Sequence, residues 1–253
     1  MGEHFAAAII GAGPAGIGAA IGLARRGIEP VLLVERRERI GGIPALYRSS
    51  SVRTFVRWSR GRVVSGQAFA DLIAGRLATT NTRVWLESQV TDINPTERRL
   101  TIVGPRRGRV EVTANVVVIA TGSREKTRAE RGWLPGSRPA GVFFTKHLLD
   151  LAEAGVKQAT TKPVIAGSDL VAYATAARMG AHIAKVELVD NCHRPQCKPT
   201  MRLFFRRWCH TRWHSASSAN IGGHDSIETL DTNNEELDLD ALVLCGDLVP
   251  NSE

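Results

Sequence analysis

Three glycines near the amino terminus have the spacing of a turn that binds the phosphates of a dinucleotide. Gly11, Gly13 and Gly16 form the pattern G-x-G-x-x-G, and Glu35 follows at the distance expected for a ribose-binding acid. The first glycine permits a tight turn, the second lets the backbone approach a pyrophosphate, and the third lets a helix pack closely on a strand. A carboxylate at Glu35 would accept hydrogen bonds from an adenosine ribose and would disfavour a 2′-phosphate.

The elements around these residues follow in the order that such a site requires. An apolar run over 6–10 predicts a strand, the small residues up to Arg26 predict a helix, and residues 31–34 predict a second strand that ends on Glu35. The ligand would then lie on unpaired N–H groups at a helix amino terminus. A glycine-rich turn that only packs a helix on a sheet would not need an acid at the end of the second strand, so we favour ligand binding.

The stretch after Glu35 extends the pattern through Arg36 to the paired glycines Gly41 and Gly42. It resembles the FAD-binding half of the two-dinucleotide-binding-domain flavoproteins, the pyridine nucleotide-disulfide oxidoreductase superfamily. The resemblance implies FAD at this first site and an α/β Rossmann-like fold with a parallel sheet, helices and a small antiparallel β-meander. Dithiol members carry a redox cysteine pair shortly after the paired glycines, and residues 43–48 contain no cysteine. The resemblance is therefore to the non-dithiol branch.

The resemblance also implies cofactor contacts from later parts of the chain. The β-branched run 116–119 predicts a fully buried parallel strand, and Ala120-Thr121-Gly122 after it resembles the segment at which the chain leaves the FAD domain. Val90 falls where the family often holds the adenine, and Gly246-Asp247 resembles the segment whose aspartate binds the ribityl chain. The complete expected set is Gly11, Gly13, Pro14, Ala15, Gly16, Glu35, Arg36, Gly41, Gly42, Val90, Ala120, Thr121, Gly122, Gly246 and Asp247.

The remaining patterns divide the chain into two predicted domains. Residues 1–123 and 236–253 are expected to form the FAD-binding domain, with a loop or short helix over 43–61, an amphipathic helix over 65–77, and meander strands over 83–93, 98–103 and 109–113. Residues 124–235 are expected to form an inserted, reduced NAD(P)-like domain. Its segment 191–218 is basic and without clear periodicity, which predicts irregular structure.

The inserted domain begins with a second strand-turn-helix pattern that departs from the first. A strand over 163–166 leads into Gly167-Ser168-Asp169, so an aspartate stands where the second glycine is needed. Its side chain would block the approach of a pyrophosphate, and its charge would repel the phosphates. NAD(P) is therefore doubtful at this second site. Without it, electrons would leave the flavin for oxygen, a quinone or a partner protein.

Composition excludes several other classes of protein. The 253 residues are 43% hydrophobic and carry a net charge of +8. The arginines are scattered and no recognition module is present, so we expect no nucleic-acid partner, although an acidic partner or anionic substrate stays open. No apolar run reaches the roughly 20 residues of a membrane span. The amino-terminal segment lacks the basic start of a signal peptide, and a cytoplasmic location is expected.

Four cysteines do not make a disulfide framework in a chain of this length. Cys192, Cys197 and Cys209 lie near histidines, which raises the possibility of a zinc site. Four residues separate Cys192 from Cys197, where a zinc knuckle has two. We therefore expect no metal, and the role of these cysteines stays open.

These features predict an FAD-dependent oxidoreductase in which a small substrate passes a hydride to the flavin. Residues 135–142 resemble a run in members that oxidise amines, amino acids or polyol phosphates. Two alternatives stay open: a non-catalytic or partner-completed flavin-binding subunit of a hetero-oligomeric dehydrogenase, and an NAD(P)H-dependent flavin reductase. The partner-completed subunit is favoured by one observation. Family members continue beyond the Gly-Asp segment with a helix that faces the flavin, whereas this sequence stops at Glu253. No catalytic residue is predicted.

Overall fold

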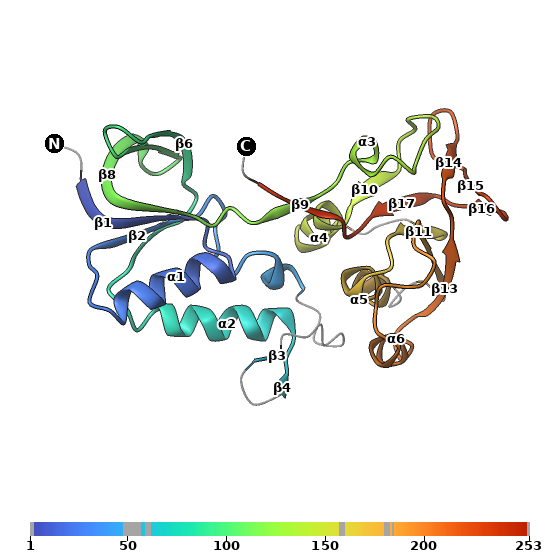
Figure 1. Cartoon of the computed structure of the whole chain (residues 1–253), viewed down its shortest axis with the longest axis horizontal. Coiled ribbons are helices and arrows are strands. Elements are labelled where there is room, and N and C mark those ends of the chain that lie inside the picture. The colour runs from blue at the N-terminus through green and yellow to red at the C-terminus, as the bar shows by residue number, and fades with distance from the viewer. Residues whose placement is uncertain are drawn as a thin grey trace. The chain divides into compact units, whose positions relative to one another are not determined.

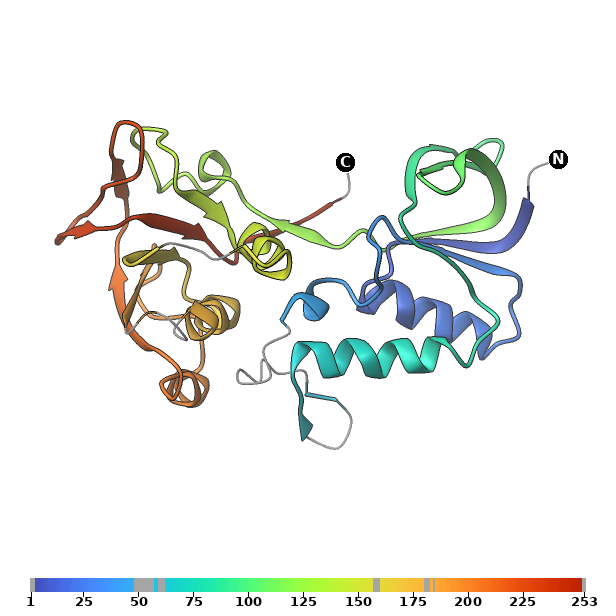
Figure 2. The ribbon, with the colours of Figure 1, turned by 180° about the vertical axis from the view of Figure 1, so that it is seen from behind.

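The computed structural model describes residues 3–47, 57–58, 62–156, 160–179, 183 and 185–251. The chain divides into two compact units, which are described one at a time. Unit 1 comprises Met1–Gly122 with Pro250–Glu253, and unit 2 comprises Ser123–Val249 (Figures 1 and 2).

Unit 1 is organised around a six-stranded sheet with the strand order β5-β2-β1-β8-β7-β6. The first four strands in this order are parallel, and β8, β7 and β6 form an antiparallel meander. The strands are β1 (Glu3–Ile10), β2 (Val31–Val34), β5 (Arg83–Trp85), β6 (Gln89–Asn94), β7 (Arg99–Gly104) and β8 (Gly108–Ile119). Strands β3 (Arg57–Trp58) and β4 (Arg62–Val63) form a separate two-stranded antiparallel sheet. The predicted parallel sheet with a β-meander is confirmed.

Helices cover one face of this sheet and the meander covers the other. Helices α1 (Pro14–Ala24) and α2 (Gly66–Leu77) lie together below β1 and β2 in Figure 1. Strands β6 to β8 lie above β1 and β2 in the same view. Alternation along β1 sends Ala7 and Ile9 into the core beneath the helices and Ala8 into the core beneath the meander. The oxygen of Ser65 accepts the Ala68 N–H at 3.1 Å, which confirms the predicted cap of α2.

Residues 43–61 were expected to form a loop or short helix. The short helix η1 (Ile43–Leu46) confirms this for the first part. Residues 48–56 and 59–61 lie outside the described residues.

Strand β8 differs from its prediction in extent and in burial. The runs 109–113 and 116–119 were expected to be separate strands, the second fully buried. They form one strand that pairs with β7 at residues 108–113 and with β1 at 112–119. Val116 is 56% exposed and Ile119 is 64% exposed. The reason is that, within the described part of the sheet, residues beyond 113 have a neighbouring strand on the β1 side alone.

Unit 2 contains a five-stranded parallel sheet with the order β10-β17-β11-β12-β13. A three-stranded antiparallel sheet, β14-β15-β16, shares a hydrophobic core with it. The strands are β10 (Val142–Phe144), β11 (Pro163–Ala166), β12 (Lys185–Asp190), β13 (His210–Ser215), β14 (Ala219–Gly222), β15 (Thr229–Thr232), β16 (Glu236–Asp238) and β17 (Ala241–Leu244). The helices are α3 (Arg128–Arg131), α4 (Thr145–Glu153), α5 (Leu170–Met179) and α6 (Pro199–Phe205). A short pair, β9 (Ser123–Glu125) with β18 (Leu248–Pro250), completes it.

Two expectations about this half of the chain are corrected. Strand β17 lies between β10 and β11 in the sheet of unit 2, so residues 236–249 belong to unit 2 and not to unit 1. The segment 191–218 is not irregular, because it contains α6 and β13. Proline in the first turn starts α6, and β13 pairs with β12 in parallel register from Lys185↔His210. Its polar sequence fits a strand at the edge of the sheet.

No helix in the described part of the chain is both long enough and apolar enough to cross a membrane.

Candidate functional site

The first glycine of the turn joins the carboxyl ends of β1 and β8. Gly11 has φ +102°, and a Cβ there would lie 2.4 Å from the carbonyl oxygen of Ala120, closer than side-chain atoms approach. The Ala120 N–H donates to the oxygen of Ile10 at 2.8 Å. A glycine is therefore required where the two strand ends meet, and Ala120 lies against the turn.

The paired glycines pack against the same turn. The Gly41 N–H donates to the oxygen of Ala12 at 2.8 Å. A Cβ on Gly42, whose φ is +63°, would lie 2.9 Å from the Cα of Gly13. By contrast, a Cβ on Gly13 would meet only Gly42 Cα, at 3.9 Å. The backbone around Gly13 is thus bare on the side where a ligand would approach.

Helix α1 begins at this bare backbone without a side chain that caps it. Gly13 is its N-cap residue, no side chain accepts a bond at the cap, and its first turn contains no acidic residue. The N–H groups of Ala15 and Gly16, just after Pro14, belong to the unsatisfied donors of a helix start. Such donors, together with the positive end of the helix dipole, stabilise an anion. The turn therefore fits a diphosphate.

Glu35 lies at the edge of this turn and is 8% exposed. Its Oε2 accepts the Ala12 N–H at 2.8 Å, and its Oε1 accepts the Arg37 N–H at 2.9 Å. Each carboxylate oxygen can accept a second hydrogen bond, so the acid can still receive ribose hydroxyls. The two backbone N–H donors fix the orientation of the Glu35 carboxylate.

The segment that carries Val90 runs beside Glu35. The Ser88 N–H donates to the main-chain oxygen of Glu35 at 2.9 Å. Arg36, Gln89 and Thr91 line a hollow of about 420 Å³. Val90 lies between Gln89 and Thr91 on β6 and is partly buried. The structure thus places Arg36 next to the strand from which an adenine contact was predicted.

Thr121 and Gly122 make contacts that the sequence did not predict. The Thr121 hydroxyl donates to the oxygen of Asn251 at 2.5 Å, and the Asn251 side-chain amide donates to the oxygen of Thr121 at 3.1 Å. The Asn251 N–H donates to the Gly122 oxygen at 2.9 Å. Asn251 therefore ties the last described residues to unit 1. A lone asparagine near a chain end carries no pattern that could have indicated this.

The turn of unit 2 repeats the strand contacts of the first turn. A Cβ on Gly167 would lie 2.5 Å from the oxygen of Cys245, and the Cys245 N–H donates to Ala166 at 2.9 Å. Gly11 and Gly167 both donate to the end of the adjacent strand, to Val34 and Val189, at 2.8 Å. Gly246-Asp247 therefore follows the strand of unit 2 that corresponds to β8. The expectation that these two residues complete the FAD domain is corrected, because similar strand ends occur in both sheets.

Asp169 fills the place that Gly13 leaves bare. Its Oδ1 accepts the Ala172 N–H at 2.9 Å at the start of α5. A Cβ on Gly246 would lie 2.8 Å from its Oδ2, so the carboxylate lies against the end of β17. Burial is the main cause that raises the pKa of Asp169. The protein's own carboxylate thus takes the donors that a phosphate would need, and this turn does not fit NAD(P).

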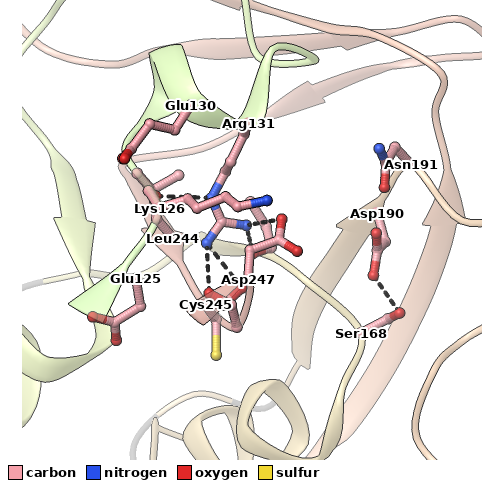
Figure 3. A network of polar contacts seen from close by, with 12 residues as sticks. Glu125, Lys126, Glu130, Arg131, Ser168, Asp190, Asn191, Leu244, Cys245 and Asp247 are labelled. Carbon is pink, nitrogen blue, oxygen red and sulfur yellow. Dashed lines mark hydrogen bonds and ion pairs between the residues drawn. The ribbon is translucent and has the colours of Figure 1, made fainter. Parts of the chain in front are cut away.

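A buried arginine closes the same end of the sheet (Figure 3). The Arg131 side chain is 1% exposed and forms an ion pair with Asp247 at 3.4 Å. Its guanidinium donates to the oxygens of Cys245 and Gly246, both at 3.1 Å, and of Ala166 at 3.3 Å. Burial lowers the pKa of this guanidinium, and the charge of Asp247 is the first to oppose the shift. The position assigned to ribityl binding is thus occupied by an internal ion pair.

The acid at the end of β12 is also engaged within unit 2. The Ser168 hydroxyl donates to the carboxylate of Asp190, as Figure 3 shows. Asp190 is the last residue of β12, whereas Glu35 directly follows β2, and Asp190 is 4% exposed. Ser168 is thus paired with Asp190, and Arg131 with Asp247, at this end of the sheet of unit 2.

Among the described residues of unit 2, the cysteines do not cluster with histidines into a metal site. Cys197 and Cys209 are buried, and burial raises the pKa of both thiols, that of Cys209 to about 11. Cys192 is partly exposed, and burial of the thiol is likewise the first cause that raises its pKa. Residues 3–47, 62–156 and 185–251, with the other described positions, contain no group of three or more His, Cys, Asp or Glu that could hold a metal ion.

Comparisons with known proteins agree with this geometry. Residues 5–253 match the family model described as pyridine nucleotide-disulphide oxidoreductase. Among solved structures, 99% of the chain superposes on thioredoxin reductase from T. acidophilum, with a TM-score of 0.71, 19% identity and 79% of that chain covered. L-proline dehydrogenase from P. horikoshii gives a TM-score of 0.66 at 22% identity, with 99% of this chain and 44% of that chain covered.

A third similar structure is the water-forming NADH oxidase from Lactobacillus brevis, with a TM-score of 0.64, 15% identity, and 99% of this chain and 55% of that chain covered. At these identities the likeness shows the fold. The chain spans about half the length of the proline dehydrogenase and the NADH oxidase. No match is found among curated proteins.

Proposed function

Because this chain belongs to the pyridine nucleotide-disulphide oxidoreductase family, whose members are FAD-dependent oxidoreductases, we propose that unit 1 holds the FAD of such an enzyme. The observation that carries the proposal is the uncapped start of α1 at Gly13, with Gly42 and Glu35 beside it. That arrangement combines anion-binding donors with an acid oriented for a ribose.

Most of the predicted residues of unit 1 have a task in this proposal. The diphosphate lies on the N–H groups of Ala15 and Gly16, with Gly13 and Gly42 leaving room for it. Glu35 accepts the ribose hydroxyls through its remaining lone pairs. Arg36 and the β6 backbone at Val90 border the adenine, and Ala120 and Thr121 border the cofactor on the β8 side. The bound flavin would supply the hydride chemistry.

We infer further that the hydride comes from a small substrate and not from NAD(P)H. The support is the second turn, where Asp169 takes the helix donors and Arg131 is already paired with Asp247. The substrate class, an amine, amino acid or polyol phosphate, is proposed from the sequence of residues 135–142. Oxygen, a quinone or an electron-accepting protein would reoxidise the flavin.

A partner-completed flavin subunit is the second candidate. The observation that favours it is the exposed apolar end of β8, where Val116 and Ile119 are 56% and 64% exposed. In the described part of the sheet this end of β8 has a neighbouring strand on one side, and such an edge with exposed apolar side chains is suited to pairing with another chain. Under this proposal, activity appears only when the partner is co-expressed, whereas FAD binding by this chain is retained.

The test is the substitution Gly13→Asp, which places in the first turn the side chain that the second turn carries. The new carboxylate would cap α1 and repel the diphosphate, so we expect FAD affinity to fall by roughly a hundredfold or more. The control is Gly18→Asp, an exposed position on the same helix with no atom within 4 Å of its Cβ position. Affinity is measured by quenching of flavin fluorescence. Equal FAD binding by Gly13→Asp and wild type would overturn the proposal.

A further inference from the structure

A cavity of about 580 Å³ lies within unit 2. It is bordered by segment 127–139 and by strands β10 and β17, which are labelled together in Figure 1. Its volume falls in the range of about 300–1,000 Å³ that is typical of small-molecule sites.

The floor of the cavity is apolar. Leu134, Val142, Phe144 and Leu244 line it, and all four belong to, or pack against, the hydrophobic core of unit 2. Leu134 and Leu244 are almost fully buried, whereas Val142 and Phe144 are partly buried. A ligand with a hydrocarbon body would cover the part of this surface that protein atoms leave open, which is favourable at roughly 25 cal/mol per Å².

Two arginines are the charged residues that line the cavity, and none of its lining residues is acidic. The Arg128 guanidinium is fixed, because it donates to the oxygens of Leu134 at 3.0 Å and Ser137 at 2.7 Å. Arg138 is exposed at the rim. Burial, and then the like charge of Arg138, lower the pKa of Arg128. An anion between the two guanidiniums would offset this like charge.

We propose that this cavity binds a small carboxylate with an apolar body. The carboxylate accepts from Arg138 and from a remaining N–H of Arg128, and the hydrocarbon lies on Val142, Phe144 and Leu244. A neutral apolar ligand would leave the two positive charges unpaired. An inorganic anion would leave the apolar floor uncovered. The proposal concerns unit 2 alone and does not rest on FAD binding.

Isothermal titration of the full chain with octanoate tests the proposal, with octanol and inorganic phosphate as the comparison probes. We expect 1:1 binding of octanoate, and affinity lower by about tenfold or more in Arg138→Ala, because a charged hydrogen-bonded contact is lost. Val142→Trp should abolish binding by filling the cavity from a partly buried strand position. Both variants are checked for wild-type circular dichroism.

The control variant is Arg106→Ala, which removes one positive charge from a side chain that is 84% exposed and outside the cavity. It should bind octanoate within about twofold of wild type. The proposal is overturned if octanoate shows no saturable binding below about 1 mM, if octanol or phosphate binds as tightly, or if Arg138→Ala binds as wild type does.

Discussion

At the scale of single residues, one position separates the two turns. Gly13 leaves the helix donors of α1 open, and Asp169 takes those of α5. This difference was visible in the sequence, since it follows from the pattern and from the missing side chain of glycine. The role of Arg131 was not visible, because its partners are carbonyl oxygens that only the folded chain brings together.

The buried Asp169 gives a prediction about pH. Its pKa is raised, mainly by burial, above the usual 3.8. When the pKa of an acid is higher in the folded than in the unfolded state, its contribution to stability is fully present below the unfolded-state pKa, where the acid is protonated in both states. This contribution is lost as the pH rises through the folded-state pKa, because the charged form is disfavoured in the fold. The variant Asp169→Asn keeps an oxygen for the Ala172 N–H and carries no charge. We therefore expect its stability relative to wild type to increase from pH 4 towards neutral pH.

Urea unfolding at a series of pH values measures this difference. Asp231→Asn, at an exposed position on β15, controls for the change in net charge. A stability difference between Asp169→Asn and wild type that stays constant, or decreases, as the pH rises would contradict the prediction.

At the scale of elements, Arg131 holds together strand ends that are distant in sequence. It joins the end of β11, the loop after β17 and the segment before α3 through bonds to Ala166, Cys245 and Lys126. The substitution Arg131→Met keeps a long apolar stem but removes the Arg131 bonds to these oxygens and leaves Asp247 without its ion-pair partner, while Ala166 keeps the bond from the Cys245 N–H. We expect a loss of about 3 kcal/mol or more in the free energy of unfolding, measured with urea.

The matched control for this loss is Arg106→Ala, since Arg106 forms a surface pair with Glu87 and such pairs contribute under about 1 kcal/mol. Equal stability losses for the two variants would show that the Arg131 contacts do not hold unit 2 together.

Elements with strong apolar periodicity were predictable, and weakly marked ones were not. The helix over 65–77 and the strands around Gly11 and Gly167 are confirmed because each carries a continuous apolar or amphipathic pattern. Strand β13 was missed because it lies at a sheet edge, where a polar sequence such as HTRWHS is tolerated. The exposure of β8 was missed because a β-branched run does not show how many strands flank it.

At the scale of the whole molecule, we expect FAD to bind to unit 1 and to slow amide exchange in that unit alone. Hydrogen exchange with mass spectrometry should show slower amide exchange at residues 11–16 and 35–42 on addition of FAD, because ligand binding to the native state stabilises it by mass action. Residues 167–172 should exchange at an unchanged rate, since Asp169 already holds the helix donors. Protection of 167–172 with no change at 11–16 would contradict the assignment of FAD to unit 1.

The boundary between the units could not be predicted because both sheets end in the same way. Strand β8 pairs in parallel with β1, strand β17 pairs in parallel with β11, and each ends against the glycine that follows its partner strand. A segment that resembles a family motif can therefore belong to either half. The register of the strands, which the sequence does not contain, decides between them.

The repeated contact of Gly11 with Ala120 and of Gly167 with Cys245 separates two tasks within one turn. The glycine at which the strand ends meet and the residue that leaves the helix donors open or occupies them are different positions in each turn. A substitution at the second position can therefore change what the turn binds while the strands still meet as before.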